Sequence, residues 1–171
     1  MYPKQAAQHE QYVWRQLKLF KSGERENPIM LGMAAALTEQ DMRDIGAYFG
    51  TQKVVAGVAD DSVIAEGANA GKKFYQVGEK IYRGGKADVQ ACAACHGPAG
   101  AGVPGPTYPA IGGQHASYTA ARLTAFRDGL VWGKDKNANV VMSQVAKNLS
   151  NEEIQALSTY LQGLHQAGQV E

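Results

Sequence analysis

The sequence predicts an all-α protein, and three observations lead to that prediction. Two stretches begin with a hydroxyl residue that is followed three positions later by a carboxylate, at Thr38/Asp41 and at Ser150/Glu153. This is the capping-box signature of a helix start. Apolar residues then recur at helical spacing, which gives each expected helix one apolar face. No stretch alternates between apolar and polar residues as strands do, so we expect no β-sheet.

The composition is that of a folded globular protein. The chain has 171 residues, of which 44% are hydrophobic and 19% charged, enough for one ordinary domain or two small ones. The formal net charge of +1 indicates neither a nucleic-acid nor a membrane partner. No apolar run approaches the roughly 20 residues that span a bilayer, so we expect no transmembrane segment. The first residues lack a basic start followed by an apolar stretch, so we expect no secretory signal in this chain.

Two parts of the chain repeat each other. Residues 2–23 and 108–129 are identical at eight positions with an offset of 106. Residues 30–49 align without gaps to residues 142–161 with an offset of 112, so the second copy carries six extra residues in between. Each copy is predicted to form two helices joined by a long loop.

The two copies differ in what precedes them. The second copy follows a further expected helix, at about Ile64–Arg83, and a short cysteine motif. The first copy has neither. We therefore expect a partial half-domain at 1–52, a linker at 53–63 and a complete domain at 64–171.

The cysteine motif carries the chemistry. The chain has two cysteines, Cys92 and Cys95, and His96 follows directly. Cys-x-x-Cys-His is the attachment signature of c-type haem: both thiols bond to one edge of the porphyrin, and the histidine binds the iron. A thiol–disulfide redox pair would want a strand–turn–helix context, which is absent. A zinc site would want a second cysteine pair. Haem is therefore the preferred interpretation.

Several other residues are candidates for the haem site. Met142 lies in an expected extended loop shortly before the last helix and is the only methionine after the motif, so we expect it to be the second axial ligand. The stretch 97–106 is rich in glycine and proline and should wrap the cofactor. We expect the carbonyl of Pro106 to accept a hydrogen bond from His96. Arg127 and Trp132 could contact the haem propionates, although a solvated charge and core packing are the favoured roles.

These residues resemble class I cytochromes c, and more closely the two-haem bacterial cytochrome c4 family. The resemblance covers essentially the whole chain and rests on residues 78–85, Cys92–Gly97, Tyr108-Pro109, residues 126–129, and Met142 with the helix start after it. It implies that the first helix of the haem domain crosses the last helix. Family members have two complete haem domains, whereas this chain lacks the first haem-binding segment. We therefore expect one haem per chain.

The resemblance also implies the function. We expect an electron carrier, not an enzyme, that transfers single electrons through a haem with histidine and methionine ligands. The implied partners are a quinol-oxidising cytochrome complex as donor and a terminal oxidase as acceptor. The implied location is the periplasm, with the membrane surface as one option. The alternatives are a subunit of a larger oxidoreductase, or a haem enzyme or gas sensor if the sixth position is open.

The half-domain at 1–52 has apolar stripes that a complete domain would cover with a haem and a third helix. A pair of short helices buries too little surface to be stable alone. It can pack on the haem domain, pair with another chain or stay loose. We expect it to be the least stable part of the chain and to drive self-association or recruit a missing fragment.

Overall fold

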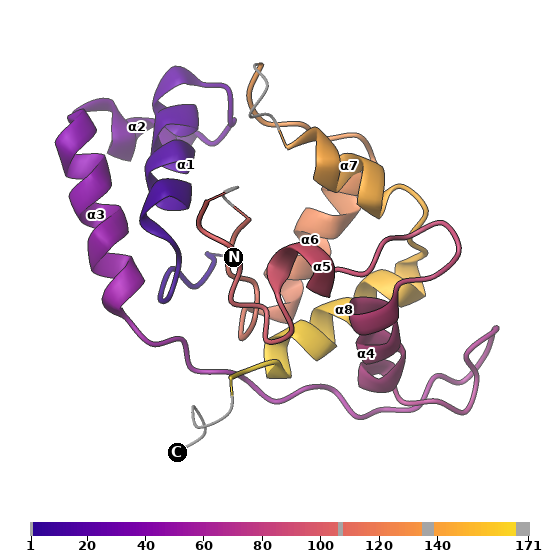
Figure 1. Ribbon diagram of the computed structural model, residues 1–171. Coiled ribbons are helices and arrows are strands. Elements are labelled where there is room, and N and C mark those ends of the chain that lie inside the picture. The colour runs from indigo at the N-terminus through magenta and orange to yellow at the C-terminus, as the bar shows by residue number, and fades with distance from the viewer. Residues whose placement is uncertain (1, 106–107, 135–138, 167–171) are drawn as a thin grey trace.

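The computed structural model describes residues 2–105, 108–134 and 139–166, and these ranges are α-helical with only isolated β-bridges. The all-α prediction is therefore confirmed. The helices, in chain order, are α1 Glu10–Ser22, α2 Pro28–Ala35, α3 Glu39–Thr51, α4 Phe74–Gly84, α5 Ala93–His96, α6 Ala116–Arg127, α7 Val140–Ala146 and α8 Asn151–Gly163. Figure 1 shows two groups, which we call the N-terminal unit (α1–α3) and the C-terminal unit (α4–α8).

The repeat in the sequence is also a repeat in the structure. Helices α1, α2 and α3 correspond in order to α6, α7 and α8, and α3 and α8 lie 112 residues apart at both ends. The two predicted capping boxes form with matching geometry. The amides of Asp41 and Glu153 donate to Thr38 and Ser150 at 3.1 Å, and both carboxylates accept the cap amide at 2.8 Å.

The connection between the two long helices of each copy is not simply a loop, as the sequence predicted, because a short helix interrupts it. α2 begins at Pro28, and the side chain of Asn27 caps it by accepting from the amide of Met30 at 3.0 Å. A proline at the first helical position and an asparagine cap both favour this start. The corresponding α7 contains Met142, which is therefore helical rather than extended.

The helix expected at Ile64–Arg83 begins ten residues later, at Phe74. Gly67 and Gly71 adopt left-handed backbone angles, with φ of 93° and 84°, and a helix cannot continue through them. The amide of Lys73 then donates to the side chain of Gln76 at 3.1 Å, and α4 starts there. The apolar spacing had suggested a longer helix, but the two glycines form a turn instead.

The core of the C-terminal unit is built on the crossing of α4 with α8. A Cβ atom at Gly78 would lie 2.1 Å from the carbonyl oxygen of Ala156 and 2.8 Å from Cβ of Tyr160, so the two backbones are nearly in contact. One turn on, the rings of Tyr82 and Tyr160 lie with centroids 5.5 Å apart. Only glycine permits such an approach, and the crossing expected from the resemblance is present.

The N-terminal unit packs against the C-terminal unit through two matching contacts. Gln8 donates to the carbonyl of Ala110 at 3.0 Å and accepts from its amide at 2.9 Å. Gln114 makes the same pair of bonds with Lys4, at 3.0 and 2.9 Å. Gln8 corresponds to Gln114 in the repeat, and Lys4 to Ala110, so the interface has approximate two-fold symmetry. Of the three outcomes expected for the half-domain, the structure therefore has the packed one.

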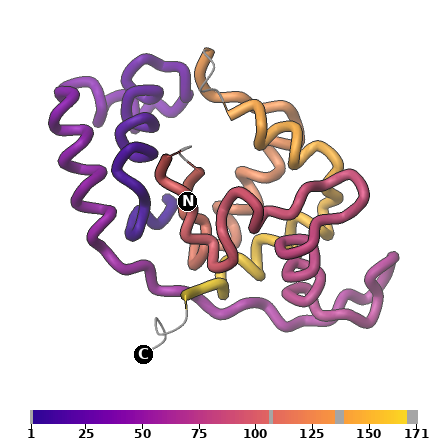
Figure 2. The backbone as a smooth tube through the Cα atoms, in the orientation of Figure 1, coloured from indigo at the N-terminus to yellow at the C-terminus, as the bar shows by residue number. Residues whose placement is uncertain are grey.

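The extended segment between α3 and α4 connects the two units. Figure 2 shows it leaving α3 and running along one edge of the C-terminal unit to α4. It is bonded to α8 on the way: the amide of Gly57 donates to the carbonyl of Gln162 at 2.9 Å, and the side chain of Gln162 donates to Val58 at 2.7 Å. The segment is therefore anchored along its course.

Candidate haem-attachment site

Cys92 and Cys95 lie on one tight helical turn. The amide of His96 donates to the carbonyl of Cys92 at 2.9 Å, which closes the first turn of α5. Residues three apart on a helical turn lie on the same side, so both thiols are available to one flat partner. Gly97, with φ of 75°, ends the turn. Tyr82 on α4 holds this end in place, because its hydroxyl donates to the carbonyl of Gly97 at 2.5 Å.

His96 is buried, with 5% of its surface exposed. Its Nδ1 lies 2.9 Å from the carbonyl oxygen of Pro109. A carbonyl can only accept, so Nδ1 carries the proton and Nε2 keeps its lone pair. Burial lowers the pKa of His96, and the bond to Pro109 only partly opposes that effect. The ring is thus held neutral and oriented, which is the form that binds a metal.

The carbonyl partner of His96 is Pro109 rather than the predicted Pro106, which lies outside the described residues. The chain folds back on itself after the motif: the amide of Gly102 donates to the carbonyl of His96 at 2.9 Å, and Val103 and Tyr108 exchange two backbone bonds. A Cβ atom at Gly102 would lie 2.4 Å from the carbonyl oxygen of Tyr108. This close return brings Pro109 to the histidine. Pro109 is repeated as Pro3, a signal that could have pointed to it.

Cys92 lacks the character of a reactive redox thiol. Both cysteines are free, and burial raises the pKa of Cys92 to about 11. A thiol–disulfide catalyst needs a thiolate, which means a lowered pKa. Among the described residues, no three histidine, cysteine or acidic side chains are grouped so as to hold a metal ion. The two competing interpretations of the motif therefore lose support.

Met142 lies on α7 at the edge of the same apolar core that Cys92 borders. Its amide donates to the carbonyl of Asn139 at 3.0 Å. The next residue, Ser143, donates its hydroxyl to the carbonyl of Leu130 at 2.6 Å. Two thiols on one side of a turn, a histidine nitrogen with a free lone pair and a methionine at the edge of an apolar core are the features that a covalent haem requires. The residues present therefore fit this group.

The two candidates for propionate contacts have other partners in the structure. Trp132 is buried and packs edge-to-face on Phe126, with ring centroids 5.2 Å apart. Arg127 donates to the side chain of Asn151 at 2.7 Å and to the carbonyl of Leu149 at 3.4 Å, at the start of α8. The position of Trp132 matches its favoured role in core packing. Arg127 is hydrogen-bonded to the residues at the start of α8. A contact of either with a propionate stays a prediction.

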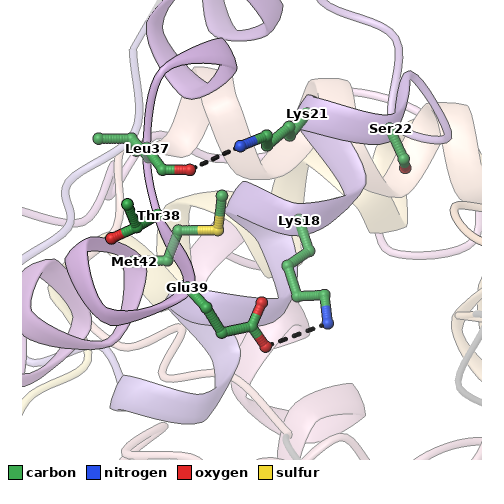
Figure 3. A pocket seen from close by; sticks show the side chains of 7 residues that line it. All are labelled: Lys18, Lys21, Ser22, Leu37, Thr38, Glu39 and Met42. Carbon is green, nitrogen blue, oxygen red and sulfur yellow. Dashed lines mark hydrogen bonds and ion pairs between the residues drawn. The ribbon is translucent and has the colours of Figure 1, made fainter.

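A surface pocket between α1 and α3 contains none of these residues. Figure 3 shows its lining, with Lys18 paired to Glu39 and Lys21 bonded to the carbonyl of Leu37. These distances are 3.3 and 2.6 Å. The polar groups of the pocket thus satisfy one another. This pocket is therefore separate from the cysteine turn.

A helical turn with two cysteines on one side, followed by a buried, oriented histidine and set in a small all-α fold, is the site of a c-type haem protein. Comparison with known proteins agrees: the cytochrome c family profile matches residues 68–165. The chain is 39% identical to cytochrome c4 of Pseudomonas aeruginosa, over 96% of this chain and 76% of that protein. It is 34% identical to the thiosulfate dehydrogenase electron acceptor of Stutzerimonas stutzeri, over 96% of this chain and 72% of that one.

The solved structures agree as well. The crystal structure of reduced recombinant cytochrome c4 from Pseudomonas stutzeri superimposes with a TM-score of 0.82 at 40% identity, over 96% of this chain and 85% of that one. The chain belongs to the cytochrome c family and is similar to the cytochrome c4 proteins along nearly all its length. It is an electron carrier with covalently bound haem c, and not an enzyme.

Proposed function

We propose that Cys92 and Cys95 form the two thioether bonds to one haem c, and that His96 and Met142 are its axial ligands. The observation that supports this most directly is the hydrogen bond from His96 to Pro109, because it fixes the ring and leaves Nε2 free. A methionine ligand raises the potential of the iron relative to other ligands.

In this proposal each residue has a simple task. Bound haem supplies an iron that takes up and releases one electron. Cys92 and Cys95 fix the position of the group by covalent bonds, so no binding equilibrium limits electron transfer. His96 is kept neutral by burial, and Pro109 keeps its ring from rotating. Met142 packs against the apolar core of the C-terminal unit, which gives the haem an apolar surface on that side.

We infer one haem per chain and a division into a half-domain at 1–52, a linker at 53–63 and a haem domain at 64–171. The chain contains two cysteines, and both lie in the one attachment motif. Residues 1–52 hold the counterparts of α6–α8 without a counterpart of α4 or α5. Met30, the counterpart of Met142, then has no haem-binding turn within its own repeat.

The partners of this carrier are redox proteins. By the cytochrome c4 resemblance we propose a quinol-oxidising cytochrome complex as donor and a terminal oxidase as acceptor, in the periplasm. A second candidate donor is an oxidoreductase that passes electrons directly to this chain. The similarity to a thiosulfate dehydrogenase electron acceptor favours this candidate. Self-association through residues 1–52 is a further proposal. Among the described residues, no helix is long and apolar enough to cross a membrane.

The axial ligand can be tested with a matched pair of variants. Met142→Ala should keep the haem attached, because attachment depends on the cysteines, but should remove the methionine–iron charge-transfer band and let ferrous iron bind carbon monoxide. Met30→Ala should leave both properties unchanged. Intact mass should report one haem in each protein. An unaltered band in Met142→Ala would assign the sixth position to another residue.

A further inference from the structure

The contact between the two units includes an arginine stacked on a tryptophan. Arg25, in the loop between α1 and α2, places its guanidinium carbon 3.8 Å from the ring centroid of Trp132. The same group donates to the hydroxyl of Tyr118 at 3.2 Å and to Gln16 at 2.5 Å. It also lies 4.5 Å from the ring of Phe20. The guanidinium is thus fixed by α1 on one side and holds two aromatic residues of the C-terminal unit on the other.

Trp132 is in turn bonded to the helix that carries Met142. The amide of Trp132 donates to the side chain of Asn139, and the carbonyl of Asn139 accepts from the amide of Met142 at 3.0 Å. The hydroxyl of Ser143 closes a second link, to the carbonyl of Leu130. Leu130, Trp132 and Asn139 are therefore linked by hydrogen bonds to the first turn of α7, and Arg25 contacts Trp132 from the other unit.

The repeat shows why an additional contact at Trp132 would stabilise this part of the chain. Arg25 and Trp132 lie in equivalent loops, each following the first helix of its copy, but the second loop is six residues longer. A longer loop loses more conformational entropy when it is held in one arrangement. The side chain of Asn27 caps α2, whereas α7 has no side-chain cap. The side chain of Asn139, which precedes α7, accepts a hydrogen bond from the amide of Trp132 instead.

We propose that Arg25 is a positioning residue for Met142: by stacking on Trp132 it holds Trp132 and Asn139 in place, so that the methionine on the first turn of α7 stays at the sixth coordination position. The half-domain then stabilises the part of the haem domain that carries Met142. This inference rests on the proposed function, in which Met142 is the sixth ligand. It assigns Arg25 no contact with the haem itself.

The test uses the holoprotein and three variants. Arg25→Ala removes the stacking on Trp132. Arg25→Lys keeps the charge but loses the planar group that bonds to Gln16 and Tyr118. Arg43→Ala is the matched control, because Arg43 stacks on Trp14 at 4.6 Å entirely within the N-terminal unit. The readouts are the rate of carbon monoxide binding to ferrous protein, the methionine–iron band, and amide hydrogen exchange over residues 130–146.

A cation–π contact of a partly buried arginine is worth about a tenfold change in the population of the state in which Trp132 and the start of α7 are released. We therefore expect carbon monoxide to bind Arg25→Ala about tenfold faster than the parent, with faster exchange over 130–146. Arg25→Lys should lie in between, and Arg43→Ala should match the parent. Parent-like rates in Arg25→Ala, or equal increases in Arg25→Ala and Arg43→Ala, would overturn the proposal while leaving the ligand assignment intact. A parent without a methionine–iron band would instead refute the ligand assignment itself.

Discussion

Helices α3 and α8 occupy the same place in the repeat but have different surroundings. Their inward positions are equally buried, with Met42 2% and Ile154 3% exposed, because each packs on the first helix of its own copy. Their outward positions differ: Tyr48 is 61% exposed and its counterpart Tyr160 is 8% exposed. The difference is α4, which covers α8, whereas no helix among the described residues covers α3 in the same way. One face of the helix is therefore set by the repeat, and the other depends on a segment that only one copy has.

The difference in cover also affects how far each helix can move when a substitution introduces a steric clash. α8 lies between α4 and α6, so it cannot move away from one neighbour without meeting the other. Among the described helices, α3 packs only on α1. The same kind of substitution should therefore cost more in the C-terminal unit, and this expectation can be measured.

The largest expected effect comes from the two glycines at the helix crossings. Gly78→Ala places a Cβ atom 2.1 Å from the backbone of Ala156, and we expect it to lower the free energy of unfolding by about 3 kcal/mol. Gly46→Ala places its Cβ atom 2.7 Å from the carbonyl oxygen of Glu10, but α1 and α3 can separate slightly. We expect its net cost to be about 1 kcal/mol, since alanine also favours the helix.

Urea unfolding of the two holoprotein variants measures both costs. Because each substitution is glycine to alanine within a helix, the gain in helix propensity is the same and cancels in the comparison. Equal losses of unfolding free energy in the two variants would mean that α3 cannot move away from α1 more easily than α8 can move away from α4.

A smaller effect is expected at the two capping boxes, which match in bond lengths but not in charge partners. Burial tends to raise the pKa of Glu153, but hydrogen bonds from Lys86 and Ser150 outweigh it and leave the pKa below its usual value. Lys86 lies 2.8 and 2.9 Å from the two carboxylate oxygens. Glu153→Gln should therefore cost about 1 kcal/mol at neutral pH. Asp41 has a pKa lowered mainly by the Thr38 hydroxyl, so Asp41→Asn should cost less.

The pH dependence gives a second check on Glu153. A carboxylate whose pKa is lowered by folding stabilises the native state above its unfolded pKa, and this contribution is lost as pH falls through the lowered value. The Glu153→Gln variant should therefore lose less stability than the parent on acidification. Urea midpoints at neutral and acidic pH measure this. An identical pH dependence in variant and parent would show that the Lys86 contact does not contribute to stability.

The features that could be predicted from sequence are the ones determined within a few residues. Thr38 and Ser150 begin their helices through local capping bonds, and the cysteine motif carries its chemistry in consecutive residues. Predictions failed where distant segments decide the structure. The start of α4 depends on the pairing of residues 62–64 with residues 71–74, in which the amide of Phe74 donates to the carbonyl of Ser62. The partner of His96 depends on how the following loop folds back. No sequence signal joins Arg25 to Trp132, because that contact forms only when the two units pack.

The smallest effect on stability is expected at Tyr48, and it tests whether the uncovered face of α3 is an interaction surface. The side chain is 61% exposed, so Tyr48→Ser should change the free energy of unfolding by no more than about 0.5 kcal/mol. If chains associate through this face, the substitution should nevertheless weaken association, because it removes a large apolar contact. Tyr2→Ser is the control, since Tyr2 is 75% exposed but lies outside α3. Sedimentation of the holoproteins over a range of concentrations measures the association. Monomers at every concentration in the parent would refute self-association. Equal weakening by both substitutions would assign the interface to a surface other than α3.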